Sequence, residues 1–517
     1  MSSNTTSSNL TAAFVDLATY DEPEKYFYGG TDAVTYFVKK LRKSTWFSVA
    51  PTVLSISGGN PGFNQSWGYK ISRAGDYLLR TWLRVQLPRV KLSGVYDQDV
   101  NVGGGANVVG GGVWKFQDCC LRWTRNLGHN LIREINISFN DLVAERMDSY
   151  YLDFWAAFTV PAGKRNGYDN MIGNIPALID PASVLSQDDS APVNVRHLPA
   201  AILCIPLPFF YARDTGIALP TAAIPYNDMV HYVTFRDLTE LLIIDNMNFS
   251  ALGAGQYSVP CQRSLLVEQN PQLPVDMWAE YAIVSNVERT QMGKAPRDIL
   301  IEQVQTAPRT QYVPANVAQT DIRFAHSIKA LFFSIRNKTN SAEYSNYTAA
   351  QPIPGFSGVN FDPVYASDPI RQTSLLYENT ARLVNMGSDY FSLIVPWYTA
   401  VSIPTETGYH LLSYTLDLVN TNPMGSTNYG KLTNVSFQFG ASEAAVLSSG
   451  VTPSLDNSEL GAPVAQTFET LVVGLNMNII RISGGKIKYV PSTVDCSMSY
   501  RNSLMEENSV RICHVYA

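Results

Sequence analysis

The sequence has few charged residues. Only 16% of its 517 residues are Asp, Glu, Lys or Arg, compared with roughly 25% in an average soluble protein. The 44 acidic residues slightly outnumber the 38 basic ones, which leaves a formal net charge of -6. This balance excludes a highly charged disordered chain and argues against a basic nucleic-acid-binding protein. Because the apolar share of 45% is ordinary, much of the surface must be uncharged and polar, which suits a protein that meets other proteins.

Cysteines and long apolar runs are scarce as well. Six cysteines in 517 residues do not form a disulfide framework, so we expect free thiols, although a pair between Cys496 and Cys513 stays open. The nearest candidate for a membrane span, Leu198 to Ala212, is too short and contains three prolines. The N-terminus has neither a basic opening nor a long apolar stretch. We therefore expect no signal peptide and expect the protein to be made and kept in the cytosol.

The sequence lacks the common catalytic and cofactor motifs. It contains no GxSxG, HExxH, CxxC or P-loop motif and no complete GxGxxG. The histidines have no Cys or His partners at metal-ligand spacing, and we expect packed or surface residues at His129, His197, His231, His326, His410 and His514. Asp97 to Asn101 resembles the start of a calcium loop, but Val102 and Val108 stand where Gly and Glu are needed. We therefore expect no catalytic residue, no cofactor and no metal site.

Short segments of alternating apolar and polar residues dominate the chain. Each is bounded by Gly, Pro, Asn or Asp, which is the pattern of a β-strand. We expect strands at Asp76 to Leu87, Ile135 to Phe139, Tyr232 to Phe235, Leu411 to Leu418 and Thr433 to Phe439. Cys204, His231 and His326 also fall in strand-like runs, and Cys204 is expected in the core. Because no long helices alternate with these strands, the pattern indicates an all-β sandwich rather than a parallel α/β sheet.

Two segments are expected to be helical. Leu142 to Phe158 is rich in helix formers. In the N-terminal arm, residues at helical spacing form an apolar stripe of Leu10, Ala13, Phe14 and Leu17. We expect the stripe to pack on a neighbouring protein, and contact with a lipid surface stays an alternative, although the arm lacks the Lys and Arg typical of such helices.

For the basic cluster from Lys39 to Lys43, the net acidity favours a strand-end or subunit contact over nucleic acid.

Two features suggest that the chain contains two β units of similar plan. Gly293 to Arg297 lies between two strand-like runs near the middle of the chain and is the best candidate for a domain boundary. Pro208-Phe-Phe-Tyr is echoed 188 residues later by Pro396-Trp-Tyr, each ahead of a strand-ending proline. Separately, six glycines in the ten residues from Gly103 to Gly112 predict a mobile loop.

Longer stretches of the sequence indicate a protein family more specifically than these short patterns do. In order along the chain they are Phe14 to Asp21 (FVDLATYD), Tyr28 to Lys39 (YGGTDAVTYFVK), Arg73 to Leu79, Ile137 to Asp141, Tyr168 to Asn174, Leu207 to Asn227, Ile299 to Pro308, Ser327 to Phe333, Leu376 to Asn379 and Pro423 to Asn434. In these stretches, from about residue 10 to about residue 485, the chain resembles the major capsid proteins of iridoviruses, which are nucleocytoplasmic large DNA viruses.

The resemblance implies an all-β double jelly roll, with two eight-stranded antiparallel sandwiches in one chain. It implies that three copies form a homotrimer, a pseudo-hexagonal capsomer, and that capsomers tile an icosahedral virion shell around an inner membrane and a DNA genome, assembled in the host cytoplasm. The implied partners are other copies of the chain, neighbouring trimers and minor capsid proteins. The inner viral membrane, reached through the N-terminal arm, is a further candidate. Direct contact with nucleic acid or a small-molecule substrate is not expected.

The resemblance also implies a division of the chain. The expected parts are an N-terminal arm (1–24), a first jelly roll (25–293), a linker (294–298), a second jelly roll (299–488) and a C-terminal extension (489–517). Residues 93–118 look longer than in relatives and would fall in the loop between strands D and E, which forms an outward tower. Met424 stands where many relatives have Ser, while Gly425 preserves the expected turn.

Other function classes stay open as alternatives. A glycan-binding jelly roll would use an aromatic platform such as Trp397 and Tyr398. A glycan hydrolase on the same scaffold would need an acid pair, for which the sequence offers only unplaced carboxylates. We expect the Asn-x-Ser/Thr sequons to reflect composition rather than glycosylation, for example at Asn64, Asn248, Asn346 and Asn434.

Overall fold

The computed structural model describes residues 4–39, 41–92, 107–109, 112–114, 119–140, 142–181, 197–246, 258–294, 296–314, 317–350, 367–378, 380–450, 465–483 and 486–489. The chain forms two units, residues 1–46 and 47–517, which are described separately. Several sequence expectations lie outside the described residues: the calcium-like segment Asp97 to Asn101, most of the glycine-rich run, the thiols of Cys496 and Cys513, and the C-terminal extension beyond residue 489.

The N-terminal unit contains two helices, α1 (Asn4–Ala18) and α2 (Glu22–Phe27). A capping box of Asp21 and Glu24 starts α2. The predicted stripe is confirmed as part of a helix, and its three largest side chains, Leu10, Phe14 and Leu17, are each at least 64% exposed. The segment that follows is equally apolar on its surface, with exposed Tyr26, Phe27, Tyr28, Tyr36, Phe37 and Trp46. The unit therefore leaves most of its large apolar side chains uncovered.

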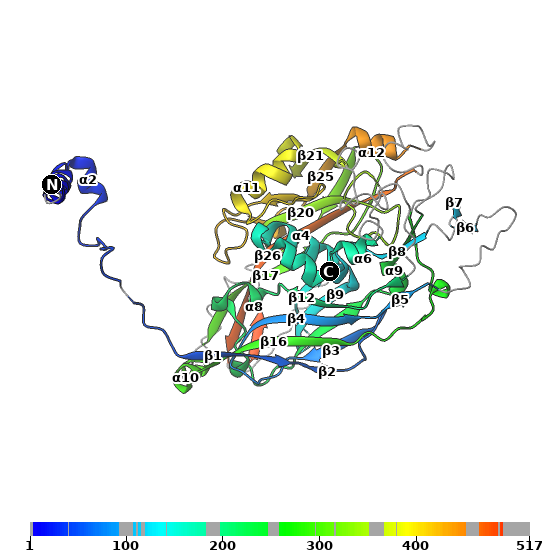
Figure 1. The fold of residues 1–517 in the computed structure, drawn as a ribbon, viewed down its shortest axis with the longest axis horizontal. Coiled ribbons are helices and arrows are strands. Elements are labelled where there is room, and N and C mark those ends of the chain that lie inside the picture. Colours follow the sequence, from blue (N-terminus) through cyan, green and yellow to red (C-terminus); the bar gives the residue numbers. More distant parts are fainter. Residues whose placement is uncertain are drawn as a thin grey trace. The chain divides into compact units, whose positions relative to one another are not determined.

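The first half of the larger unit is a sandwich of two antiparallel sheets (Figure 1). One sheet has the order β1-β16-β4-β12, with β1 (Phe47–Val53), β4 (Tyr77–Leu87), β12 (Ala201–Leu207) and β16 (Val275–Val284). The other has the order β10-β9-β13-β3-β2, with β2 (Ser55–Ser57), β3 (Ser66–Lys70), β9 (Ile132–Phe139), β10 (Leu142–Asp148) and β13 (Met229–Phe235). In β13 alternate residues are buried, because one face packs on the facing sheet and the other lies outside.

The second half repeats this plan. Its first sheet has the order β17-β26-β20-β23, with β17 (Arg297–Thr306), β20 (Ser327–Asn337), β23 (His410–Ser413) and β26 (Phe468–Ser483). Its second sheet has the order β19-β25-β21-β22, with β19 (Ala318–Ile322), β21 (Ile370–Tyr377), β22 (Thr380–Gly387) and β25 (Val435–Ala441). The three-residue strand β2 is left out of the following count. If the other eight strands of each half are numbered along the chain, both halves have the sheet orders 1-8-3-6 and 2-7-4-5. This recurring order is the double jelly roll that the resemblance implies.

The connections between strands are unequal in length. Strands β9 and β10 are joined by a tight hairpin in which Asn140 has a φ of 48°, and Glu378, with a φ of 49°, lies at the corresponding hairpin between β21 and β22. The connections β4 to β9, β10 to β12 and β13 to β16, and their counterparts in the second sandwich, are long and contain most of the helices. In a jelly roll these long connections emerge at the same end, so the chain builds one elaborate face on each sandwich.

The remaining elements lie mostly in these connections. In the first sandwich they are β5 (Val90–Lys91), β6 (Asn107–Val109), β7 (Gly112–Trp114), β8 (Cys119–Trp123), α3 (Leu127–Leu131), α4 (Ser149–Thr159), α5 (Ala162–Ile172), α6 (Pro176–Ile179), β11 (His197–Leu198), α8 (Phe210–Arg213), η3 (Thr215–Ile217), η4 (Thr221–Ala223), α9 (Leu238–Leu241), β14 (Leu242–Asn246), β15 (Ser258–Pro260) and η6 (Arg263–Leu265). Helix α10 (Asn286–Lys294) joins the sandwiches, and the second contains β18 (Gln311–Tyr312), η7 (Tyr390–Ile394), α11 (Val395–Thr399), β24 (Thr427–Asn428), η8 (Tyr429–Lys431), α12 (Glu443–Ser448) and β27 (Lys486–Tyr489).

Several local predictions need correction. The expected helix at Leu142 to Phe158 is half wrong, because residues 142–148 are strand β10 and only α4 is helical. Pairing with β9 overrides the helix propensity of its Ala, Glu and Met residues. The strand predicted from Leu411 ends at Ser413. His326 has a φ of 63° and lies before β20 rather than within it, and Cys204 is only half-buried, on the outer side of β12.

The sequence echo does not mark equivalent positions. Pro208-Phe-Phe-Tyr follows the sixth strand of its sandwich, whereas Pro396-Trp-Tyr precedes the sixth strand of the other. The chain does contain two units of similar plan, but the evidence for this is their shared strand order and not the sequence echo. The expectation for Gly425 is confirmed, because its φ is 130° and a Cβ there would lie 2.3 Å from the carbonyl oxygen of Tyr414.

Candidate functional site

The histidines do not form a catalytic or metal centre in the described residues. No group of three or more His, Cys, Asp or Glu side chains there is placed to hold a metal ion. The nearest arrangement to a nucleophile pairs His410 with Ser388 and Asp368, but both partners contact the same ring nitrogen, Nε2, at 2.9 and 2.7 Å. A triad needs the serine and the carboxylate on opposite nitrogens, so this cluster is a packing contact.

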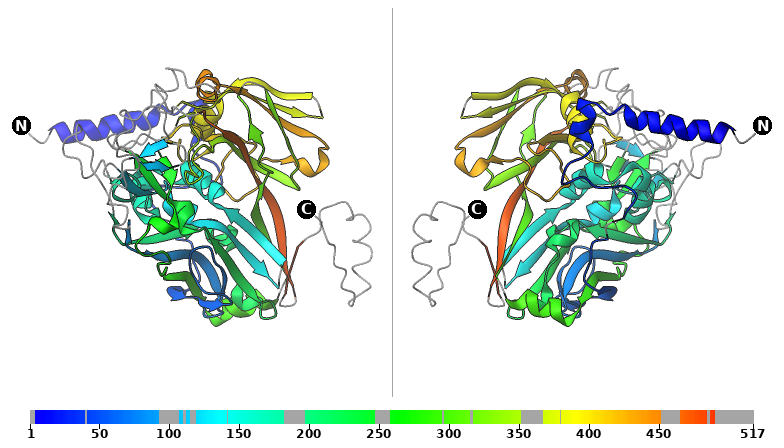
Figure 2. Two further views of the ribbon diagram at one scale, coloured as in Figure 1. Left: turned by 90° about the vertical axis from the view of Figure 1, so that its right-hand side faces the viewer. Right: turned by 90° about the vertical axis from the view of Figure 1, so that its left-hand side faces the viewer.

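The most elaborate polar chemistry lies at the junction of the two sandwiches. Helix α4 of the first sandwich packs on β20 of the second. The turned views of Figure 2 show how the first sandwich, blue to green, meets the second, green to red. Phe332, which is fully buried, lies with its ring centroid 5.8 Å from Phe154 and 5.7 Å from Phe158. Nearly all of β20 is buried, because its outer face meets the other sandwich instead of solvent. The aromatic contact buries apolar surface between the sandwiches, and the polar groups around it fix their relative orientation.

A segment of the second sandwich, residues 340–350, inserts into the first. Ser345 donates from Oγ to Asp153 Oδ2 at 2.5 Å and accepts from Asn130 Nδ2 at 2.7 Å. Tyr347 donates from its hydroxyl to the same carboxylate oxygen at 3.1 Å, while Asp153 Oδ1 contacts His129 Nδ1 at 2.6 Å. Asp153 therefore joins side chains from both sandwiches into one buried network. We call residues 340–350 the junction segment.

Arginines hold the first part of the junction segment, around Glu343 and Tyr344. Arg122, on β8, donates from Nε to Asp245 and from Nη1 to Glu343, each at 2.5 Å, and all three side chains are at most 4% exposed. Burial lowers the pKa of Arg122, but the two carboxylates more than offset this and raise it above its ordinary value. The ring of Tyr344, the residue after Glu343, contacts two guanidinium groups, with Arg236 at 4.0 Å and Arg336 at 4.9 Å from its centroid.

A second ionic cluster lies between β10, α8, β17 and β20. Arg213 pairs with Glu302 and donates to the hydroxyl of Tyr151 at 2.7 Å and to Glu145 at 3.5 Å. Lys329 donates to Glu302 Oε1 at 2.5 Å and to the carbonyl oxygen of Asn420 at 2.6 Å. Two acids and two bases thus balance one another in a buried space. Two residues come from each sandwich, so the cluster fixes their relative position as well.

The second cluster predicts a pH effect at Glu145. Burial raises the pKa of this carboxyl to about 7, with Arg213 opposing the shift. Because the folded-state pKa lies above the ordinary value of 4.5, the folded protein binds this proton more tightly, and the contribution to stability falls as pH rises from about 4.5 to 7. The variant Glu145→Gln lacks this term. The free energy of unfolding of the variant minus that of the wild type should therefore increase by roughly 2–3 kcal/mol from pH 5 to pH 8. Urea titrations at each pH measure this difference.

A matched control is Glu134→Gln on β9, at the surface beside Arg146. Its stability relative to the wild type should stay within about 0.5 kcal/mol, as for ordinary surface substitutions. A constant difference between Glu145→Gln and the wild type across this pH range would contradict the prediction.

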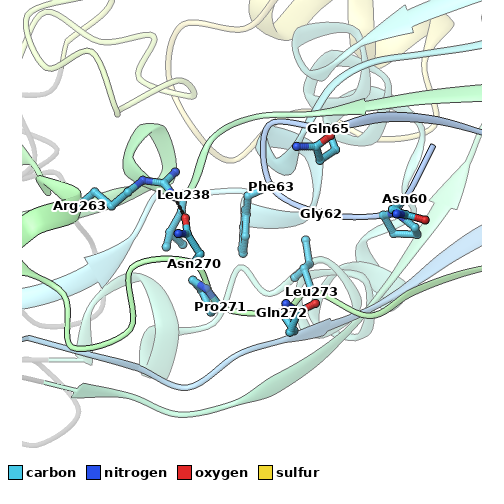
Figure 3. A pocket seen from close by; sticks show the side chains of 11 residues that line it. Asn60, Gly62, Phe63, Gln65, Leu238, Arg263, Asn270, Pro271, Gln272 and Leu273 are labelled. Carbon is cyan, nitrogen blue, oxygen red and sulfur yellow. Dashed lines mark hydrogen bonds between the residues drawn. The ribbon is translucent and has the colours of Figure 1, made fainter.

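A polar cleft lies at the loop end of the first sandwich. It has a volume of about 430 Å³ and is bounded by the β2–β3 connection and the long connection before β16. Figure 3 shows the ring of Phe63 between the side chains of Leu238 and Leu273, with amides such as Gln65 and Asn270 at the rim. Arg263 forms one wall, where Asp237 and Asn270 hold its guanidinium. The cleft lies far along the chain from Trp397 and Tyr398, the residues proposed for a glycan platform.

Those two aromatics belong to an apolar depression of about 410 Å³ on η7 and α11, lined by Leu393, Ile394, Trp397, Tyr398 and Ile403. Trp397 is 70% and Tyr398 76% exposed. By contrast, the aromatic residues of the other echo segment, Phe209, Phe210 and Tyr211, are buried.

The comparisons with known proteins agree with this architecture. The family described as "Major capsid protein N-terminus" matches residues 35–284, and "Large eukaryotic DNA virus major capsid protein" matches residues 288–487. The major capsid protein of Tipula iridescent virus is 53% identical over 486 residues, which are 93% of this chain and 97% of that protein. That of Lymphocystis disease virus 1 is 43% identical, over 93% of this chain and 98% of its own length.

The chain belongs to the iridovirus major capsid protein family. This family is a structural one and not an enzyme class, and membership makes the chain a protein of the virion capsid. Two solved structures share the fold: the capsid of the virus PBCV-1, with a TM-score of 0.64, 18% identity and coverage of 89% of this chain and all of the other, and the Faustovirus major capsid protein, with a TM-score of 0.62, 12% identity and coverage of 87% and 93%.

The sequons and the basic cluster can now be placed. Asn346 is fully buried, and its side chain bonds the backbone of Thr348 and Ala350, so it is a structural residue of the junction segment. Asn64 and Asn434 are exposed, and Asn248 lies outside the described residues. In the basic cluster, the described residues 41–43 are exposed and in no strand or helix. Within the described residues no helix is both long and apolar enough to cross a membrane.

Sequence reasoning missed the junction. Its acidic residues, Asp153, Glu302 and Glu343, have no spacing that would single them out. The arginines that pair with Glu302 and Glu343 are 89 and 221 residues away, and Asp153 bonds His129, Ser345 and Tyr347 instead. A weak local signal existed in the junction segment, since Glu343, Tyr344 and Tyr347 stand among small residues in a part of the chain without strand periodicity.

Proposed function

We propose that the protein forms homotrimers in which six similar sandwiches, two from each copy, make a pseudo-hexagonal capsomer. These capsomers tile an icosahedral shell around an inner membrane and a DNA genome, assembled in the host cytoplasm. The observation that carries the proposal is the repeat of one strand order within one chain, because three copies then supply six similar units around a threefold axis. The junction supports it, since buried ionic and aromatic contacts between the sandwiches give each copy a single shape.

The scarcity of charge fits a tile whose sides meet other tiles. A shell is held by many modest contacts that sum to a stable assembly, and few charges mean little repulsion between crowded copies. For the division of the chain we propose the arm, the two jelly rolls, the linker and the C-terminal extension with the bounds given above. The strands begin at Phe47, and helix α10 ends at Lys294, the first residue of the proposed linker.

Mass measurement and imaging test this function together. Purified protein should elute with the mass of three chains by light scattering and show hexagonal outlines of uniform size in negative stain. A monomer at all concentrations, with no hexagonal particles, would overturn the proposal. A trimer that binds a defined sugar on a glycan array would instead favour the glycan-binding alternative.

We also propose that residues 93–118 form an outward tower and take no part in the trimer contacts. Deleting Gly103 to Gly112 should therefore leave the trimer mass unchanged, because the sandwich strands that this connection joins, β4 and β9, pair within their own sandwich. Light scattering of the deletion variant measures this, with thermal unfolding as the control for the fold. Recovery of folded monomers would contradict the proposal.

For the N-terminal unit we propose a protein partner: a neighbouring trimer or a minor capsid protein at the inner side of the shell. Its exposed Leu10, Phe14 and Leu17 offer an apolar stripe, and α1 has no basic residue in its last turn. The inner membrane remains the other candidate. Flotation with anionic vesicles separates the two, because a peptide of the arm, residues 1–24, contains no Lys or Arg and should stay unbound if the arm serves proteins alone.

A further inference from the structure

The second sandwich has an exposed apolar surface, the aromatic patch, on the connection between β22 and β23. We define it by Leu393, Ile394, Trp397, Tyr398 and Ile403. The first four are 52%, 47%, 70% and 76% exposed. Side chains of this size together expose on the order of 500 Å² of apolar surface, which is as large as the largest patch on a typical monomer and marks an interaction site.

The patch is held rigidly. Phe391, in the π-helical turn η7, is fully buried and packs with its ring centroid 5.2 Å from Phe333 in the sandwich core. In α11 the hydroxyl of Thr399 donates to the carbonyl oxygen of Val395 at 2.8 Å. The backbone N–H of Ser402 donates to the carbonyl oxygen of Phe158 at 3.0 Å, which ties the patch to helix α4 of the first sandwich. A preorganised platform loses little conformational entropy when a partner covers it.

The chemistry of the patch selects its partner. Only the hydroxyl of Tyr398 and the indole N–H of Trp397 are polar among its side chains, whereas a sugar site needs several convergent polar groups. A lipid surface would favour Lys or Arg around the apolar residues, but the charged residues on either side in the sequence are the acids Asp389 and Glu406. An uncharged aromatic patch fits a protein surface.

We infer that the aromatic patch is a subunit contact, buried in the capsomer against the neighbouring copy of this chain. The inference rests on the proposed trimer and names the surface that closes it. A specific interface buries about 800 Å² on each partner with a more apolar core, and a patch on the order of 500 Å² is the size of such a core. In a threefold ring the contact joins two different surfaces, so each copy presents its patch once and the ring leaves none uncovered.

The test is the double variant Trp397→Ser/Tyr398→Ser, compared with Tyr226→Ser. Tyr226 is 69% exposed and lies in the connection before β13 of the first sandwich, outside the patch. Because exposed aromatics at the centre of an interface are its strongest contributors, the double variant should dissociate to monomers at a protein concentration at least a hundredfold higher than the wild type. Tyr226→Ser should match the wild type, and light scattering over a dilution series measures all three.

The outcomes separate the two ideas. Suppose that the wild type is a trimer and that the double variant dissociates at a protein concentration within threefold of that of the wild type. The patch is then no subunit contact, and the proposed function stands. If the wild type is a monomer throughout, the proposed function fails and the inference fails with it. Hydroxyl-radical footprinting of the wild type gives a second readout that needs no variant: oxidation of Trp397 and Tyr398 should fall several-fold in the trimer relative to diluted monomer, and equal oxidation overturns the inference.

Discussion

Replacing Arg122 by methionine should lower the free energy of unfolding by roughly 3–5 kcal/mol, the cost of removing one partner from a buried ion pair. The variant leaves the carboxylates of Asp245 and Glu343 buried without the guanidinium that each now contacts at 2.5 Å. Methionine fills most of the volume but donates no hydrogen bond. Because Glu343 belongs to the junction segment, the loss should loosen the second sandwich against the first as well as destabilise β8.

The measurement is the urea midpoint of the purified protein, followed by both tryptophan fluorescence and circular dichroism. A matched control is Arg84→Met, since Arg84 pairs with Asp276 at 3.9 Å with both side chains at least 35% exposed. Surface pairs of this kind contribute about 1 kcal/mol or less. Equal effects at Arg122 and Arg84 would show that the buried cluster does not hold the junction.

The sequence predicts the strands of this fold well where one face of a sheet is covered and the other is open. In β13 the apolar residues of the YVTF segment are the buried ones and the others are more exposed, because one face of the strand packs on the facing sheet. The prediction fails at β10, where the local choice of Ala, Glu, Arg and Met favours a helix and the pairing partner lies in the preceding strand. It fails again at β20, which is buried on both faces and has no alternation to read.

The functional surfaces were less accessible to sequence reasoning. The resemblance identified the family and the fold, and the relatives confirm both. The junction contacts depend on residues such as Arg213 and Lys329, whose partners are fixed only by the packing of one sandwich on the other. The pair Trp397 and Tyr398 drew attention as aromatics, but their neighbours Leu393 and Ile394 are what distinguish a protein contact from a sugar platform. Those neighbours come together only because η7 and α11 turn them to the same side.

Gly408 offers the second large effect, because it lies directly against Tyr347 of the junction segment. Its φ is 94°, which L side chains rarely adopt, and a Cβ would lie 2.1 Å from the carbonyl oxygen of Tyr347. The variant Gly408→Ala should therefore lose about 3 kcal/mol or more, from the strained φ and the displaced backbone together.

The displaced residue connects this effect to assembly. Tyr347 donates its hydroxyl hydrogen bond to Asp153, so a shift of its backbone should also disturb the network that joins the sandwiches. The control is Gly293→Ala in α10, where a Cβ would meet nothing within 4 Å and helix propensity should make the change neutral or slightly stabilising. Urea unfolding and light scattering of both variants test this, and a loss below about 1 kcal/mol at Gly408 would mean that the junction segment can move aside, so that the sandwiches are less firmly fixed than a rigid tile requires.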